Sequence, residues 1–329
     1  MFKKTLCVLA CGMALGTFAG AASAAEELMI YTSMKESLIG RIKDAFVKKN
    51  PGIKVDYQSA GAGKLMAKIA TERQSGRIMT DLLWTSEVPD FYHMKSEGLL
   101  EKYSSPELKN VVNPLPDFDG SFTAVRLGTL GVAYNTRYIK TAPKTWKDIA
   151  GPAYKGAFGI ANPALSGTSY MSVQLLVDAF GWDYIKSLKA NGAKVGKGSG
   201  QVVDDTASGD LVGSLGVDYI VSDKIEKGAT MALAYPPEML VIPSPVAIIK
   251  GTKNLPVAQK FVDFLLSAEC QDIIAQEGTV PVRKGVKAAV KGIPTAEEAQ
   301  ARAMKIDYVK IINAKEATIK QFNEIMQIR

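Results

Sequence analysis

Residues suited to the capture of an anion lie between an apolar run and a helical segment near the middle of the chain. The run covers residues 158–161, and Ser166-Gly167-Thr168-Ser169 follows it before helical periodicity begins at about Tyr170. Hydroxyl groups and the unpaired backbone N–H groups of a helix N-terminus together bind phosphate, phosphonate, sulfate or carboxylate. The glycine allows a ligand to approach the backbone closely. The segment therefore predicts an anion site, although such residues also start ordinary helices.

Small polar residues and glycines also end three apolar runs in the first hundred residues. They are Thr32 and Ser33 after residues 28–31, Gly61 and Ala62 after residues 53–57, and Thr85 and Ser86 after residues 81–84. In open α/β sheets, ligands bind beyond the carboxyl ends of the strands. We therefore expect these residues to gather at one edge of a sheet and to contact a ligand. The alternative is that they serve only as turn and cap residues.

Two acidic residues follow later apolar runs and could hold the other end of a ligand. Asp218 ends the run 211–217, and Glu238 follows the run 231–235 and two prolines. An ionised carboxylate only accepts hydrogen bonds, so it calls for a donor such as an ammonium group or a sugar hydroxyl. The alternatives are that Asp218 caps a helix starting near Tyr219 and that Glu238 is an exposed loop residue.

Residues for catalysis or metal binding are scarce. The chain has one histidine, His93, and three cysteines. It has no G-x-S-x-G sequence and no zinc-like spacing of cysteine and histidine, and Gly61-Ala62-Gly63-Lys64 lacks the spacing of a nucleotide-binding phosphate loop. We expect no catalytic centre, no metal site and no cofactor, and we interpret His93 as a structural residue of a helix.

The composition is that of a globular protein. Of the 329 residues, 47 % are hydrophobic and 22 % are charged. Lys and Arg together number 40 against 33 Asp and Glu, which gives a formal net charge of +7. The basic residues are scattered along the chain, so binding of nucleic acid is not predicted. The length predicts about two domains.

Apolar runs with strand character alternate with helical segments, a pattern typical of an α/β fold with a parallel sheet. Strands are predicted at residues 28–31, 53–57, 81–84, 158–161, 211–217, 231–235 and 241–249. Helices are predicted at about 38–46, 64–73, 170–180, 201–208, 257–266 and 268–276, and residues 307–328 predict one long helix.

The N-terminus has the features of a cleaved signal peptide. Two lysines precede an uncharged stretch over residues 5–25, and Ala22-Ser23-Ala24 fits the small-x-small rule for cleavage. We expect residues 1–24 to be removed and the mature protein to be periplasmic, and an uncleaved membrane anchor is the alternative. Cys270 would then be the one remaining cysteine, and it is predicted to be a buried thiol without a disulfide.

Several stretches, spread over nearly all of the predicted mature chain, carry a family resemblance. They are Leu28–Ser33, Ala45–Val55, Asp81–Trp84, Gly131–Asn135, Pro143–Ile149, Asn162–Thr168 and Ala258–Glu269. Through them the chain resembles the periplasmic solute-binding proteins of ABC transporters, in particular their ferric-iron-binding-protein-like branch.

The resemblance implies the two-lobed α/β fold of type II-like binding proteins, with two chain crossings at a hinge near residues 126–134 and 236–247. Lobe one would comprise residues 25–128 plus 246–329, and lobe two residues 129–245. The resemblance further implies that a small anionic solute lies between the lobes. Hinge closure would present the closed form to an inner-membrane ABC permease, and the protein would be a monomer.

Ferric iron is disfavoured as the solute by the residues themselves. Iron-binding members of this branch use adjacent tyrosines, whereas here Tyr219 is followed by Ile220. A ferric ion would lack its expected oxygen ligands. The resemblance assigns Tyr219 to the ligand site without the paired phenolate.

Other members of the branch bind hexose phosphates or 2-aminoethylphosphonate. The matching positions here are Ser166, Thr168 and Ser169 for the anion, with Asp218 and Glu238 at the far end of the cleft. Hexose-phosphate-binding members place a histidine just before the aspartate, and this chain has a valine there. We therefore prefer a 2-aminoethylphosphonate-like solute. A hexose phosphate, a ferric ion and a role as a secreted phosphate-ester enzyme are the alternatives.

Overall fold

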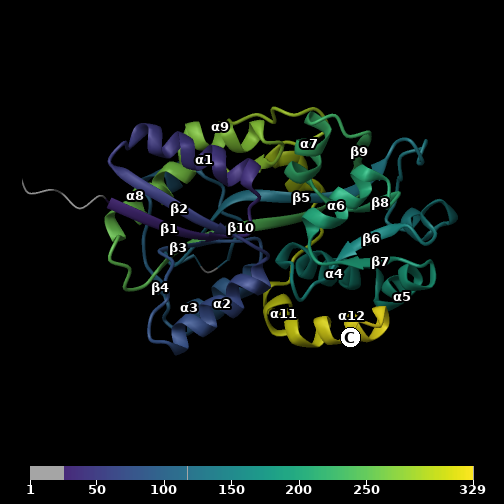
Figure 1. The fold of residues 1–329 in the computed structure, drawn as a ribbon, viewed down its shortest axis with the longest axis horizontal. Helices are drawn as coiled ribbons and strands as arrows, with labels where there is room; N and C mark the ends of the chain where they lie inside the picture. The colour runs from purple at the N-terminus through teal and green to yellow at the C-terminus, as the bar shows by residue number, and fades with distance from the viewer. Residues whose placement is uncertain (1–25, 117, 329) are drawn as a thin grey trace, which may run out of the picture.

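The computed structural model describes residues 26–116 and 118–328. The predicted signal peptide, residues 1–24, lies outside this part of the chain. The described residues form two lobes that lie side by side and share one curled sheet of 11 strands (Figure 1). The strand order along the main path is β2-β1-β3-β10-β5-β8-β6-β7. The predicted two-lobed α/β architecture is confirmed.

The first lobe is a parallel unit in which helices follow strands, as the alternating pattern predicted. Strand β1 pairs in parallel with both β2 and β3. Helix α1 buries the face that carries Leu38, Ile42 and Phe46, which recur at helical spacing. The elements are β1 (Glu26–Thr32), α1 (Glu36–Lys49), β2 (Ile53–Ser59), α2 (Ala62–Gln74), β3 (Leu82–Trp84), α3 (Val88–Ser96) and β4 (Leu100–Glu101).

The second lobe repeats this plan on the other end of the sheet. Strand β6 pairs in parallel with β7 and β8. Helix α4 begins at Gly167 because the hydroxyl of Ser166 accepts a hydrogen bond from the Ser169 N–H. The elements are β6 (Phe158–Ala161), α4 (Gly167–Phe180), α5 (Trp182–Ala190), β7 (Lys194–Gly196), α6 (Ser199–Ser208), β8 (Gly213–Val217), α7 (Asp218–Glu226) and β9 (Met231–Ala234).

Two long strands connect the lobes. The chain enters the second lobe along β5 (Thr123–Asn135) and returns along β10 (Leu240–Ile249), and the two strands pair antiparallel at the centre of the sheet. At their outer ends β10 pairs with β3, and β5 pairs with β8 and β9. These strands are the two predicted crossings. The lobe boundaries at 128/129 and 245/246 fall inside them and stay predictions.

The C-terminal segment contacts both lobes, and our placement of residues 246–329 with lobe one stays a prediction. Helices α8 (Leu255–Leu266) and α9 (Ala268–Gln276) do pack on α1, and α9 buries Cys270 as a free thiol. Strand β11 (Val280–Pro281) joins β5, and α10 (Ala296–Arg302) follows. The predicted helix over 307–328 is interrupted at Ala314, giving α11 (Tyr308–Asn313) and α12 (Lys315–Met326). Helix α12 packs against α4 and α5 of the second lobe.

A buried charge cluster ties α12 to α3. Lys315 forms ion pairs with Glu87 and Asp90, whose side chains are buried. Burial raises the pKa of Glu87 to about 7, the charge of Asp90 adds to this rise, and Lys315 opposes it.

Within the described residues, no helix has the length and apolarity needed to span a bilayer.

Replacing Glu87 by glutamine should flatten the pH dependence of stability. A carboxyl whose pKa is raised in the folded state contributes its full stabilisation only below its pKa in the unfolded state, which is about 4.3 for glutamate. For Glu87 this contribution is lost as the pH rises through the folded-state pKa of about 7. Between about pH 4.5 and about pH 8, urea denaturation should show that wild type loses more unfolding free energy than Glu87→Gln, by on the order of 2–3 kcal/mol. The exposed Glu297→Gln is the control. Identical pH profiles for wild type and Glu87→Gln would contradict the prediction.

Candidate functional site

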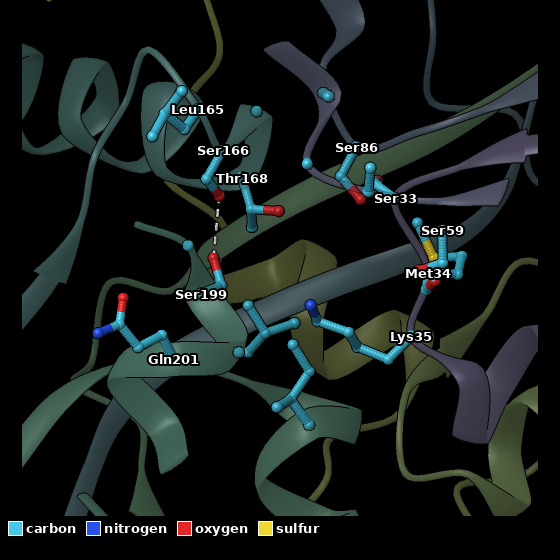
Figure 2. Close-up of a pocket in the computed structure, with 18 of the residues that line it drawn as sticks. Ser33, Met34, Lys35, Ser59, Ser86, Leu165, Ser166, Thr168, Ser199 and Gln201 are labelled. Atoms are coloured by element: carbon cyan, nitrogen blue, oxygen red, sulfur yellow. Dashed lines mark hydrogen bonds between the residues drawn. The ribbon is translucent and has the colours of Figure 1, made fainter. Parts of the chain in front are cut away.

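A cavity of about 320 Å³ lies between the lobes (Figure 2). The first lobe and β5 line it with Ser33, Met34, Lys35, Ser59, Ala60, Gly61, Ala62, Lys64, Ser86 and Arg126. The second lobe lines it with Leu165, Ser166, Gly167, Thr168, Lys197, Gly198, Ser199, Gly200, Gln201, Val217, Tyr219 and Ile220.

The N-terminal ends of several helices converge on this cavity. The residues that directly precede α1, α2, α4, α6 and α7 all line it: Lys35, Gly61, Ser166, Gly198 and Val217. They meet because each helix starts where a strand ends, and the strands of each lobe end at the same edge of the sheet. A helix N-terminus carries partial positive charge and unpaired N–H groups. The cavity is therefore polarised for an anion.

The structure brings most of the predicted hydroxyl and glycine positions together at the cavity. These positions are Ser33, Gly61, Ala62, Ser86, Ser166, Gly167 and Thr168, joined by Tyr219. Ser166 Oγ lies 3.0 Å from Ser199 Oγ, which links the starts of α4 and α6. The hydroxyl of Thr168 points into the cavity (Figure 2) and has no hydrogen-bond partner within the described residues.

Three of the predicted hydroxyl residues lie behind the cavity wall. Thr32 accepts a hydrogen bond from the Met34 N–H at 3.0 Å, and Thr85 accepts one from the Glu87 N–H at 3.4 Å. Ser169 donates to the Ala161 carbonyl at 2.5 Å. All three side chains are buried, so they shape the turns that carry the lining residues instead of facing the cavity.

Asp218 also lies outside the cavity lining, contrary to its predicted contact with a ligand. Its carboxylate accepts hydrogen bonds from the Thr129 N–H at 2.8 Å, from Thr279 Oγ1 at 2.7 Å and from the Tyr219 N–H at 2.7 Å. Arg126 Nη1 lies 3.4 Å from it. Burial raises the pKa of Asp218, while Arg126 and these hydrogen bonds act in the opposite direction. Donors of the protein thus occupy the oxygens that we expected a ligand to use.

Glu238 is exposed and lies outside the cavity as well. Its backbone carbonyl accepts a hydrogen bond from Trp146 Nε1 at 2.8 Å, and Arg302 holds the carbonyls of the preceding residues 235–237. The chain there is fixed through its backbone, which leaves the Glu238 side chain in solvent. The predicted acidic end of the site is absent from the lining.

Positively charged residues of the lining were missed by the sequence analysis. They are Lys35, Lys64, Arg126 and Lys197. Lys35 lies two residues after Ser33, and Lys197 directly precedes Gly198-Ser199-Gly200, so both lysines lie beside strand-end residues of the predicted kind. Arg126 lies in the apolar strand β5 with its side chain 1 % exposed. A charged residue inside an apolar strand needs a buried partner of opposite charge. The arginine in this strand was therefore a signal in the sequence from which the buried pair of Arg126 and Asp218 could have been predicted.

The chain is similar to known proteins over most of its length. The family described as "Bacterial extracellular solute-binding protein" matches residues 79–311. The chain belongs to this family. Its members bind small solutes and work with ABC permeases.

Individual relatives of this solute-binding protein bind different solutes. A protein of Salmonella typhimurium named "Putative 2-aminoethylphosphonate-binding periplasmic protein" is 25 % identical over 260 residues, covering 74 % of this chain and 73 % of the relative. Two solved structures are similar. One is AfuA from Actinobacillus pleuropneumoniae with fructose 6-phosphate bound, at TM-score 0.80, 25 % identity and coverage of 92 % and 99 %. The other is iron-bound HitA from Pseudomonas aeruginosa, at TM-score 0.75, 26 % identity and coverage of 91 % and 99 %.

The lobes of this solute-binding protein touch at glycines along the rim of the cavity. A Cβ atom on Gly61 would lie 2.2 Å from the Leu165 carbonyl oxygen, and one on Gly63 would lie 2.2 Å from the Ala164 carbonyl oxygen. A Cβ on Gly167 would meet the Cβ of Glu87 at 2.3 Å. The missing side chains allow the backbones of α2 and of the segment before α4 to approach across the cleft.

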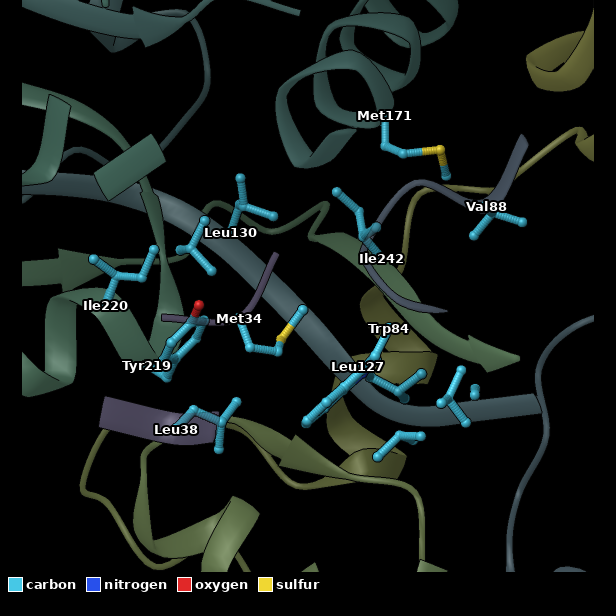
Figure 3. Close-up of a cluster of buried hydrophobic side chains, with 14 of the residues drawn as sticks. Met34, Leu38, Trp84, Val88, Leu127, Leu130, Met171, Tyr219, Ile220 and Ile242 are labelled. Carbon is cyan, nitrogen blue, oxygen red and sulfur yellow. The ribbon is translucent and has the colours of Figure 1, made fainter. Parts of the chain in front are cut away.

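Below the rim, the lobes share a hydrophobic cluster around β5 (Figure 3). Met34 and Trp84 come from the first lobe, Met171 and Tyr219 from the second, and all four are buried. The cavity floor is therefore continuous with the core of the molecule.

Gly63→Ala should keep the lobes from closing without harming the fold. Gly63 is in the first turn of α2, where alanine is compatible with the helix, but its methyl group would collide with the Ala164 carbonyl across the cleft. We expect affinity to fall about tenfold or more, because the closed state is disfavoured. Calorimetry measures the affinity and small-angle scattering measures compaction, with fructose 6-phosphate or 2-aminoethylphosphonate, whichever the wild type binds.

Gly52→Ala is the matched control, because nothing lies within 4 Å of its Cβ position. Wild-type affinity and compaction in Gly63→Ala would show that closure does not depend on this contact.

Proposed function

We propose that this protein is the periplasmic solute-binding component of an ABC importer and that it captures a small organic phosphate or phosphonate between its lobes. The observation that carries the proposal is the convergence of helix N-termini, hydroxyls and four cationic side chains on one cavity. A tetrahedral dianion offers the many acceptor oxygens that such a set of donors can satisfy. We further propose that the mature protein begins at Ala25 and acts as a monomer.

The anion is proposed to bind at the starts of α4 and α6. Ser166, Thr168 and Ser199 are hydroxyl donors on one wall, and Gly167 brings the backbone N–H groups of α4 within reach. Ser33 and Ser86, together with the backbone at Gly61 and Ala62, face them from the first lobe. The similarity to AfuA with fructose 6-phosphate bound and to the 2-aminoethylphosphonate relative supports a phosphorus-containing solute.

A ferric ion and a hydrolytic reaction are both less well supported by the lining. Within the described residues it contains no carboxylate and no histidine, and Tyr219 is its one tyrosine. A ferric ion calls for several anionic oxygen ligands, and ester hydrolysis calls for a general base near the ester. We therefore propose a binding protein and not an enzyme. An assay of phosphate released from sugar phosphates over hours should find none above buffer.

Thr168→Ala should weaken the binding of phosphonates and sugar phosphates by about 10–100-fold. The hydroxyl has no partner within the described residues, and a hydrogen bond to a charged group contributes about 1.5–3 kcal/mol. A thermal-shift screen of both classes of compound identifies a binder, and calorimetry then compares the variant with wild type.

Thr71→Ala is the control, since it makes the same change of threonine to alanine at an exposed position of α2 away from the cavity. Unchanged affinity in Thr168→Ala would place the anion elsewhere. Binding of no phosphate or phosphonate compound by the wild type would contradict the proposed function.

A further inference from the structure

A guanidinium group occupies the place where the sequence predicted carboxylates. Arg126 lines the cavity from β5, and Asp218 lies behind it as its counter-ion. The ring of Tyr219 stacks against the guanidinium, whose Cζ lies 4.9 Å from the ring centroid. A solute that enters the cavity therefore meets the cation of this ion pair and not its anion.

The hydrogen bonds of Arg126 leave donor capacity toward the cavity. Nη1 donates to Thr279 Oγ1 at 2.7 Å, and Nε contacts Met34 Sδ at 3.3 Å. Within the described residues, the contact recorded for Nη2 is a long one of 3.4 Å to Ser86 Oγ. Nη2 carries two hydrogens, so a buried side chain with 1 % exposure lacks a full set of acceptors. An under-used buried donor of this kind calls for an acceptor from the solute.

Unlike Arg126, the remaining cations of the lining have no anionic partner within the described residues. Lys35, Lys64 and Lys197 form no salt bridge within residues 26–116 and 118–328. Lys35 reaches across the cleft, so that a Cβ on Gly200 in the first turn of α6 would lie 3.0 Å from its Nζ. A cation at a helix N-terminus is unfavourable, because both are positive, unless an anion lies close to the cation and to the helix end. The excess of positive charge is larger than one phosphate group would offset.

We infer that the captured solute carries a second anionic group, a carboxylate, at its end toward Arg126, and no ammonium group there. This inference rests on the proposed function and narrows it. A carboxylate matches the planar guanidinium through paired hydrogen bonds. An ammonium group at the same place would face Arg126 with no carboxylate in the lining to offset the repulsion. A hydroxyl would accept a hydrogen bond from Arg126 but would not offset the excess positive charge of the lining lysines.

Three phosphonates that differ only in the terminal group test the inference on the wild-type protein. 3-Phosphonopropionate, 2-hydroxyethylphosphonate and 2-aminoethylphosphonate share a two-carbon chain and end in a carboxylate, a hydroxyl and an ammonium group. Calorimetry should find that the carboxylate compound binds about tenfold or more tightly than the hydroxyl compound, with the ammonium compound weakest.

Equal affinities, or tightest binding of 2-aminoethylphosphonate, would overturn the inference and leave the proposed function intact. Binding of none of the three, with no sugar phosphate bound either, would overturn both.

A pair of variants locates the preference at Arg126. The double variant Arg126→Gln with Asp218→Asn removes both charges of the buried pair, so neither is left uncompensated. The carboxylate-to-hydroxyl affinity ratio should fall to about one in this variant, and thermal melting checks that it folds. Lys197→Met is the matched control at the anion end, and it should weaken all three compounds equally while keeping the ratio. A ratio of about ten in the folded double variant would overturn the assignment to Arg126.

Discussion

The buried pair of Arg126 and Asp218 decides what this cleft presents to a solute. It joins the crossing strand β5 to the start of α7, and Thr129 and Thr279 donate further hydrogen bonds to Asp218. Desolvating two charges is costly, so each must be fully compensated by the protein or by a ligand. Asp218 is compensated by donors of the protein, whereas Arg126 keeps donor capacity on the cavity side. The hinge and the ligand site therefore depend on the same interaction.

The rest of the site follows from the direction of the strands. Parallel strands in each lobe end at one edge, and the helices that follow them all begin there, so their positive ends converge without any special sequence. The lobes then bring two such edges together. Gly61 and Gly63 let the backbones approach, and Gly167 leaves room for the Glu87 side chain. Since the lining lysines form no salt bridges within the described residues, the field of the helix ends is reinforced instead of neutralised.

The sequence predicted features that depend on local periodicity and missed those that depend on distant partners. Strand β6 and helix α9 match their predicted ranges, and the hydroxyls of Ser166 and Thr168 lie at the cavity as the strand-end pattern indicated. Asp218 has the same local pattern but is held by residues that lie 61 to 92 positions away in the chain, and no spacing rule reports such contacts. The predicted last helix is interrupted at Ala314, where α11 packs on α3 and α12 packs on α4 and α5, and periodicity does not report such packing either.

A crystal structure of the mature protein with 3-phosphonopropionate tests the central claim most directly, because it locates both ends of a solute in the cleft. We predict that the phosphonate lies at the starts of α4 and α6, within hydrogen-bond distance of Thr168 and Ser199, and that the carboxylate lies against Arg126 in a closed cleft. A phosphonate that contacts neither helix start, or a compound bound outside the cleft, would contradict the account.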